Sequence, residues 1–192
     1  MKLLVTGSSG GIGGAVKAAA LAAGWEVAEL NRDGFAALDD SGAGLPDGLD
    51  AVVFATGTCP VVPLTQLADA AFAETVGVNC GLFVRLMRSL VKARKYAPSG
   101  LRVVAISSVS ASEGWAGGAA YCASKGALSA VARAMDAELR SRGISVKAIE
   151  PRYVRTRMFD RCAGRMGVDP ALARDPADLA REILGMLEDR ET

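Results

Sequence analysis

A tyrosine and a lysine four residues apart, Tyr121 and Lys125, have the residue types and the spacing best suited to chemistry in this chain. They stand where a helix is predicted to begin, and a four-residue spacing places both side chains on one helical face. A free tyrosine has a pKa of about 10, so it is a poor proton shuttle at neutral pH. We expect the ammonium of Lys125 to favour the phenolate and to lower the pKa of Tyr121 for general acid–base work. The hydroxyl of Ser108 follows a predicted strand and is expected to bond the same substrate oxygen. This spacing also occurs by chance on surface helices, so the interpretation depends on the rest of the chain.

A glycine-rich loop near the N-terminus indicates phosphate binding. Lys2–Thr6 is a short apolar run typical of a buried strand, and an alanine-rich helix is predicted over Ala15–Ala23. Between them lies the sequence Gly7-Ser8-Ser9-Gly10-Gly11-Ile12-Gly13-Gly14. Glycines permit a tight turn and a close approach of backbone to a pyrophosphate, and a helix N-terminus offers free N–H groups to the anion. A flexible loop without a ligand is the alternative, and the flanking strand and helix argue against it.

The residues after the second predicted strand, Trp25–Leu30, bear on the choice of nucleotide. An acid at this point of a dinucleotide fold bonds the ribose 2′-hydroxyl of NAD, whereas an arginine accommodates the extra phosphate of NADP. The chain has Asn31, Arg32 and Asp33 there. Arg32 favours NADP slightly, and NAD stays open because both charges can also be solvated loop residues. A short strand is predicted over Phe35–Leu38, with Asp39 at its end beside the adenine.

Strands and helices alternate along the whole chain, which predicts an α/β fold with a doubly wound, Rossmann-like parallel sheet covered on both faces. Ligands in such sheets bind beyond the carboxyl ends of the strands. We expect one domain over 1–192, with a cofactor half at about 1–100 and a catalytic and substrate half at about 101–192. Further strands are predicted over Leu49–Ala55, 100–107 and Ile144–Ile149, and helices over about 65–95, 121–142 and Ala177–Glu188. One composite site is expected where the strand ends bring together Gly7, Asn31, Gly57, Ser108 and Pro151.

The composition excludes several other classes of function. A net charge of +1 gives no general attraction to nucleic acid or to an anionic membrane, and no segment is expected to approach a membrane span. The chain has no histidine, which removes histidine-dependent nucleophilic schemes and the commonest metal ligand. Its 4 cysteines are far apart, so no metal site is predicted and free thiols in a reducing compartment are expected. A short apolar N-terminal run does not suit a signal peptide, so a cytoplasmic location is expected.

Five ordered motifs resemble the short-chain dehydrogenase/reductase family over nearly the whole chain. They are the TGxxxGIG pattern of Thr6–Gly13, Asn79 in a long helix, Ile106-Ser107-Ser108, the YxASK pattern of Tyr121–Lys125, and Pro151 followed by Thr156. The resemblance implies an NAD(P)-dependent oxidoreductase that interconverts an alcohol and a carbonyl on a small molecule.

The resemblance also implies roles for the catalytic residues. Tyr121 would exchange a proton with the substrate oxygen, and Ser108 would position that oxygen. Lys125 would tune Tyr121 and hold the nicotinamide ribose, and Asn79 would hold a water that links Lys125 to solvent. NADP is slightly preferred over NAD, and the implied cofactor-binding residues are Gly7, Ser9, Gly11, Ile12, Gly13, Asn31, Arg32, Asp39, Ala55, Gly57, Tyr121, Lys125, Pro151 and Thr156.

Three features depart from the family pattern. The family's NNAG segment appears as Phe54-Ala55-Thr56-Gly57, which lacks the bracing asparagine, and the glycine after Pro151 is Arg152. Arg152 is expected either to clash with the cofactor or to reach an anionic substrate. The family's last strand and glycine-rich tail do not follow the final helix, so we expect a homodimer through the two long helices, which light scattering would distinguish from a tetramer. The short segment 157–176 is expected to be the lid over the substrate, which suits an open pocket and a small substrate.

These departures leave an alternative function open. A catalytically weak member of the family would bind a dinucleotide and act as a sensor or partner-binding subunit. The intact set of Ser108, Tyr121, Lys125 and Asn79 argues against it. An epimerase or dehydratase of the extended relatives is disfavoured by the glycine spacing and the short chain.

Overall fold

The computed structural model describes residues 1–189 and contains one fully parallel sheet of five strands. The strand order is β2-β1-β3-β4-β5, so the chain crosses over after β2 and winds in both directions from β1. The predicted doubly wound α/β fold is therefore confirmed. The strands are β1 (Lys2–Thr6), β2 (Glu26–Leu30), β3 (Ala51–Phe54), β4 (Leu101–Ile106) and β5 (Ile144–Ile149).

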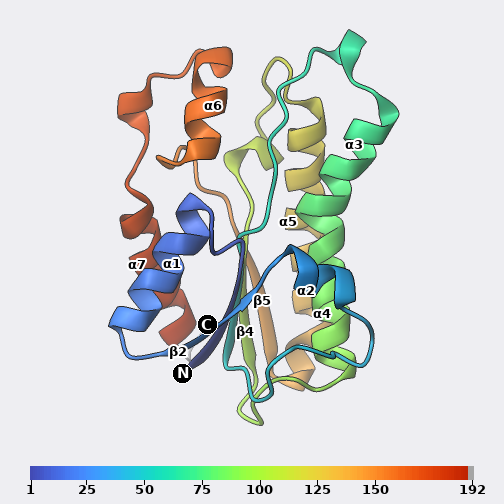
Figure 1. Cartoon of the computed structure of the whole chain (residues 1–192), viewed down its shortest axis with the longest axis vertical. Coiled ribbons are helices and arrows are strands. Elements are labelled where there is room, and N and C mark those ends of the chain that lie inside the picture. The colour runs from blue at the N-terminus through green and yellow to red at the C-terminus, as the bar shows by residue number, and fades with distance from the viewer. Residues whose placement is uncertain (190–192) are drawn as a thin grey trace.

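Helices cover both faces of the sheet, as parallel strands require. Figure 1 shows α1 (Gly11–Ala22) and α7 (Pro176–Glu188) on one face. The other face carries α3 (Asp69–Val76), α4 (Leu82–Lys92) and α5 (Ala119–Leu139). The short helix α6 (Arg157–Met166) lies above the sheet, at the end where the strands finish.

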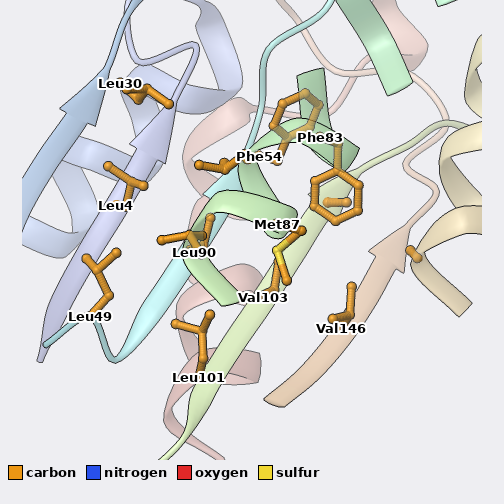
Figure 2. Close-up of a cluster of buried hydrophobic side chains, with 14 of the residues drawn as sticks. Leu4, Leu30, Leu49, Phe54, Phe83, Met87, Leu90, Leu101, Val103 and Val146 are labelled. Carbon is orange, nitrogen blue, oxygen red and sulfur yellow. The ribbon is translucent and has the colours of Figure 1, made fainter. Parts of the chain in front are cut away.

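Alternating residues of each strand build two separate cores, one under each helical layer. Leu4, Phe54 and Val103 point toward α4 and α5, where they meet Phe83 and Leu90 (Figure 2). Their neighbours along the strands point the other way, toward α1 and α7. Because the central strands β1, β3 and β4 are buried on both faces, close packing holds their carboxyl ends in fixed relative positions.

The predicted strand over Phe35–Leu38 is wrong, because Arg32–Ala37 forms the helix α2. The side chain of Asn31 accepts a hydrogen bond of 2.9 Å from the backbone N–H of Gly34, which caps the helix N-terminus. Phe35 and Leu38 are three residues apart, so both turn inward, and they are 4% and 2% exposed. The apolar residues thus follow the helical period, and the cap formed by Asn31 favours a helix over a strand.

The long helix predicted to end at Lys95 runs from Asp69 to Lys92 and contains a turn of π-helix over Gly77–Gly81. By length and composition, Asp69–Lys92 is apolar enough to cross a membrane, so the expectation that no segment approaches such a span is wrong. A core helix of a soluble protein passes the same test. Here the helix packs on the sheet through Phe83, Leu86 and Leu90, which are fully buried.

Candidate active site

A cleft of about 1510 Å³ opens at the carboxyl ends of the strands, where the sequence places its composite site. Its lining extends from the glycine loop at the start of α1 to the helix α6. The predicted residues that line it are Gly7, Ser9, Gly11, Ile12, Gly13, Asn31, Arg32, Ala55, Gly57, Ser108, Tyr121, Lys125, Pro151 and Thr156. Segments more than 100 residues apart in the chain therefore contribute to one wall.

The glycine loop forms a cradle in which side chains have no room. A Cβ atom on Gly13 would lie 2.3 Å from the carbonyl oxygen of Gly7. Gly7 has φ +66°, and a Cβ atom there would lie 2.6 Å from the carbonyl oxygen of Ala55. A Cβ atom on Gly11 would lie 2.4 Å from Cγ2 of Thr156, which brings the loop after β5 onto the cradle. These close approaches explain why the sequence needs glycine at three positions of the motif.

The same loop leaves the N-terminus of α1 available to an anion. Helix α1 begins at Gly11, four residues earlier than predicted, and its N-cap residue Gly10 has no side chain to bond the first N–H groups. Its first turn also carries no acidic residue. Unpaired N–H groups and the positive end of the helix dipole together suit a phosphate. The residues present therefore fit a dinucleotide pyrophosphate.

The far end of the cleft carries both signs of charge. Arg32 is exposed, lines the cleft and lies in the first turn of α2, whereas Asp33 does not line the cleft. Glu29 also lines it, which the sequence interpretation missed. Its carboxylate is bonded by Ser8 and Lys17, which lower its pKa, with the Lys17 hydrogen bond the larger cause. The available signal was its position near the carboxyl end of β2, where ligands of parallel sheets bind.

The structure places Asp39 outside this wall. Its carboxylate accepts hydrogen bonds from the backbone N–H of Ser41 at 2.9 Å and from the Ser41 hydroxyl at 2.6 Å. These bonds lower the pKa of Asp39 and hold a turn after α2. The predicted contact of Asp39 with the adenine required a strand over Phe35–Leu38, and this strand does not form. Asp39 does not line the cleft, so its prediction as a cofactor-binding residue is wrong.

The three central catalytic candidates converge on one part of the cleft. Lys125 is 5% exposed, and its Nζ donates a hydrogen bond of 2.7 Å to the carbonyl oxygen of Ile106, at the end of β4. The same Nζ lies 5.7 Å from the centre of the Tyr121 ring. The Ser108 hydroxyl, two residues after β4, is close enough to Tyr121 to lower the pKa of its phenol. The Tyr121 phenol and the Ser108 hydroxyl therefore lie side by side in the cleft, with the Lys125 amine near the Tyr121 ring.

The predicted effect of Lys125 on Tyr121 is wrong in this structure. The pKa of Tyr121 is raised well above its usual value of 10, because burial disfavours the phenolate and outweighs the opposing bond from Ser108. Burial likewise lowers the pKa of Lys125 from 10.5 to about 8. The spacing of the two residues indicates the neighbouring charge, whereas the desolvation of both groups arises only in the folded chain.

Asn79 lies behind this group and fixes the backbone beside it. It is fully buried in the π-helical turn, and its Oδ1 accepts a hydrogen bond of 2.7 Å from the backbone N–H of Thr58. Its Nδ2 donates to the carbonyl oxygen of Thr58 at 2.9 Å and to the hydroxyl of Ser124 at 2.8 Å. A Cβ atom on Gly57 would lie 3.3 Å from the Oδ1 of Asn79 and 3.7 Å from the Nζ of Lys125. Asn79 thus holds the segment after β3 against Lys125.

Two of the departures from the family pattern are compensated. The Thr56 hydroxyl donates a 2.8 Å hydrogen bond to the hydroxyl oxygen of Thr6, and the Ala55 N–H donates to the same oxygen at 3.2 Å. These bonds brace the ends of β1 and β3 where the expected asparagine is missing. Arg152 is turned to Glu113, which accepts two hydrogen bonds of 2.6 and 3.2 Å from its guanidinium. Its charge is therefore already paired at the cleft wall.

Burial of Lys125 predicts a specific dependence of stability on pH. Between pH 8 and 10.5 the unfolded chain holds the lysine proton more tightly than the folded chain, so the free energy of unfolding rises with pH in that window. Relative to Lys125→Met, the wild type should gain about 3 kcal/mol between pH 7 and 10.5, at about 1.36 kcal/mol per pKa unit.

Urea denaturation of both proteins across this pH range measures the difference. Both variants keep Tyr121, so its titration cancels to first order. The lost bond to Ile106 lowers the stability of Lys125→Met by an amount that does not change with pH. Parallel stability curves would show that the amine is not buried as described.

Comparisons with known proteins agree with this geometry. A family model described as short chain dehydrogenase matches residues 37–165, more than half of the chain. Nodulation protein G of Rhizobium sp. (strain N33) is 28% identical in an alignment 186 positions long, which covers 83% of this chain and 76% of that protein. The short-chain reductase protein NovJ of Streptomyces niveus is 34% identical over 106 residues, or 55% of this chain. The chain spans 40% of the length of NovJ.

Solved structures share the fold. The protein lin1944 of Listeria innocua superposes with a TM-score of 0.79 at 23% identity, covering 97% of this chain and 93% of that one. A variant of actinorhodin polyketide ketoreductase, solved with NADPH, gives a TM-score of 0.78 at 20% identity and covers 97% of this chain and 89% of that one. At these identities the likeness concerns the arrangement of strands and helices.

Proposed function

The chain belongs to the short-chain dehydrogenase/reductase family, and from this premise we propose that it is an NAD(P)-dependent oxidoreductase that interconverts a carbonyl and an alcohol on a small molecule. The observation that carries the proposal is the convergence of Ser108, Tyr121 and Lys125 in the cleft that begins at the glycine cradle. A nucleotide held by the cradle and a substrate beside Tyr121 would share this cleft. The relatives include proteins described as reductases, which supports the same class of reaction.

Each residue has a distinct part in the proposed reaction. A nicotinamide dinucleotide, when bound, supplies or accepts the hydride. The phenol of Tyr121 donates its proton to the carbonyl oxygen, and the hydroxyl of Ser108 positions that oxygen. Because burial raises the pKa of Tyr121, the phenol stays protonated at neutral pH, which favours reduction of a carbonyl. Lys125 would bond the nicotinamide ribose. Asn79 would hold a water that links Lys125 to solvent.

NADP is the proposed cofactor, because Arg32 lines the cleft and forms no ion pair within residues 1–189, while Lys17 pairs with Glu29. Arg32→Ala should weaken binding of NADPH about tenfold, which is about 1.4 kcal/mol, and leave NADH binding nearly unchanged. Fluorescence titration of both nucleotides measures the selectivity. The cleft contains Trp115, whose emission is a natural probe.

Asp33→Ala is the matched control, since Asp33 adjoins Arg32 but does not line the cleft. It should leave the affinity for both nucleotides within about twofold. Equal weakening of NADPH and NADH by Arg32→Ala would show that the arginine does not meet a 2′-phosphate. Binding of neither nucleotide to the intact chain would overturn the proposed function itself.

The proposed assembly is a homodimer through the outer faces of α4 and α5. Helix α5 exposes small side chains at Ala123, Ala130, Ala134 and Ala137, which allow another helix to approach closely. The helix Asp69–Lys92 adds apolar surface beside it, including the exposed ring of Phe72.

A further inference from the structure

Two cysteine thiols meet at the substrate end of the cleft. Cys59 lies in the segment after β3, and Cys162 lies 103 residues later on α6. Their Sγ atoms are 3.5 Å apart, and the Cys162 thiol also lies 3.6 Å from the Cys59 carbonyl oxygen. Both residues line the cleft. Within residues 1–189 the other two cysteines, Cys80 and Cys122, have no such thiol neighbour.

The contact belongs to a strap, residues 59–62, that joins α6 to the loop before α5. Arg165 of α6 donates a hydrogen bond of 2.9 Å to the carbonyl oxygen of Val61. The N–H of Val62 donates a bond of 3.0 Å to the carbonyl oxygen of Gly117. The two thiols therefore sit where α6, the predicted lid, is attached to the body of the protein.

The thiol pair also lies close to the catalytic candidates. Both Cys59 and Cys162 raise the pKa of Tyr121 electrostatically, and the charge of Lys125 acts on Cys59. The geometry agrees, because Cys59 directly follows Thr58, whose backbone is hydrogen-bonded by Asn79 in the segment beside Lys125. A change in covalent state at the thiols would alter both the attachment of α6 and the surroundings of Tyr121.

We propose that Cys59 and Cys162 are a redox-modification site at which a low-molecular-weight disulfide converts the pair into an intramolecular disulfide that fixes α6 over the cleft. The Cys59 thiolate attacks the reagent, forms a mixed disulfide and releases one small thiol. The Cys162 thiol then loses its proton, attacks the Cys59 sulfur and displaces the second small thiol. Two protein thiols are oxidised while one reagent disulfide is reduced to two thiols.

Access decides the order of these steps. Cys59 is partly exposed, whereas Cys162 is only 4% exposed, so the reagent meets Cys59 first. Burial raises the pKa of the Cys59 thiol, which makes its thiolate scarce at neutral pH. The rate of oxidation should therefore rise about tenfold per pH unit from pH 7 to 9.

The test treats the full chain with oxidised glutathione at pH 8.5, alkylates the remaining thiols and analyses a non-reduced digest by mass spectrometry. The expected product is a peptide pair joined through Cys59 and Cys162. Cys162→Ser should instead accumulate a glutathione adduct on Cys59, because the resolving thiol is gone. Cys80→Ser and Cys122→Ser are matched controls that should form the cross-link as the wild type does. A persistent adduct in the wild type, a cross-link through Cys80 or Cys122, or no oxidation would each overturn the proposal.

The effect on activity rests on the proposed function, and a second measurement separates the two. Carbonyl reduction with NADPH should fall at least about tenfold in the cross-linked protein and return with dithiothreitol. Cross-linking without a change in activity would refute the closure of the cleft. A chain that cross-links but neither binds NADPH nor reduces carbonyls before oxidation would refute the proposed function and leave the disulfide site established.

Discussion

Replacing Tyr121 with phenylalanine should lower kcat/KM for carbonyl reduction about a thousandfold, the typical contribution of a positioned proton donor. The substitution removes only the phenol oxygen and keeps the ring near Trp115, whose centre lies 6.3 Å away. Binding of NADPH should stay within about threefold of wild type, because the glycine cradle and Arg32 are untouched. Steady-state kinetics and fluorescence titration on the same preparation separate the two effects.

The chain offers a matched control in Tyr153. It also lines the cleft, but it packs on Phe159 with ring centres 5.7 Å apart and is not among the groups that converge on the substrate oxygen. Tyr153→Phe should leave kcat within about threefold of wild type. If Tyr121→Phe retains full activity, Tyr121 is not the proton donor. If the wild type binds NADPH but reduces no carbonyl in a broad screen, the dinucleotide-binding sensor becomes the better hypothesis.

The second large effect is expected from Gly13→Ala. The added Cβ atom would lie 2.3 Å from the carbonyl oxygen of Gly7 and 2.7 Å from its carbonyl carbon, and neither backbone atom can move without opening the cradle. We expect a loss of about 2 to 3 kcal/mol in the free energy of unfolding, as for other overpacked sites. Affinity for NADPH should fall at least about a hundredfold, since the N–H groups of α1 are displaced from the phosphate position. Urea denaturation and nucleotide titration measure the two losses.

Gly185→Ala provides the control for this substitution. Gly185 is exposed on α7, has no atom within 4 Å of an added Cβ, and does not have a positive φ. Alanine there should raise the free energy of unfolding by about 0.5 to 1 kcal/mol, the usual advantage over glycine in a helix. NADPH affinity of Gly13→Ala equal to wild type would show that the cradle does not hold the nucleotide.

The fold class and most of the residues that line the cleft could be predicted from the sequence, because they follow from local rules. Apolar runs ended by polar or glycine residues predict parallel strands, and parallel strands bring their carboxyl ends to one edge. The bounds of β1 and β5 and the placement of Gly7, Ser108 and Pro151 just beyond strand ends followed from this alone. The match of motif spacings led to the same family that the comparisons show.

Other features depended on contacts between distant parts of the chain. The local Asn31 cap starts the helix α2, but its orientation depends on packing of Phe35 against Phe54, whose ring centre lies 6.3 Å away. The compensation of the missing asparagine by Thr56 depended on the pairing of β1 with β3.

The tertiary structure alone decided the electrostatics of the site. The four-residue spacing of Tyr121 and Lys125 gave their proximity, but the sign of the pKa shift at Tyr121 came from burial by segments elsewhere in the chain. Likewise, 103 residues separate Cys59 from Cys162, and only the fold of α6 over the strap brings their sulfurs within 3.5 Å. Spacing along a chain fixes which neighbours share a helix face, whereas desolvation and contacts between remote segments exist only once the whole chain has packed.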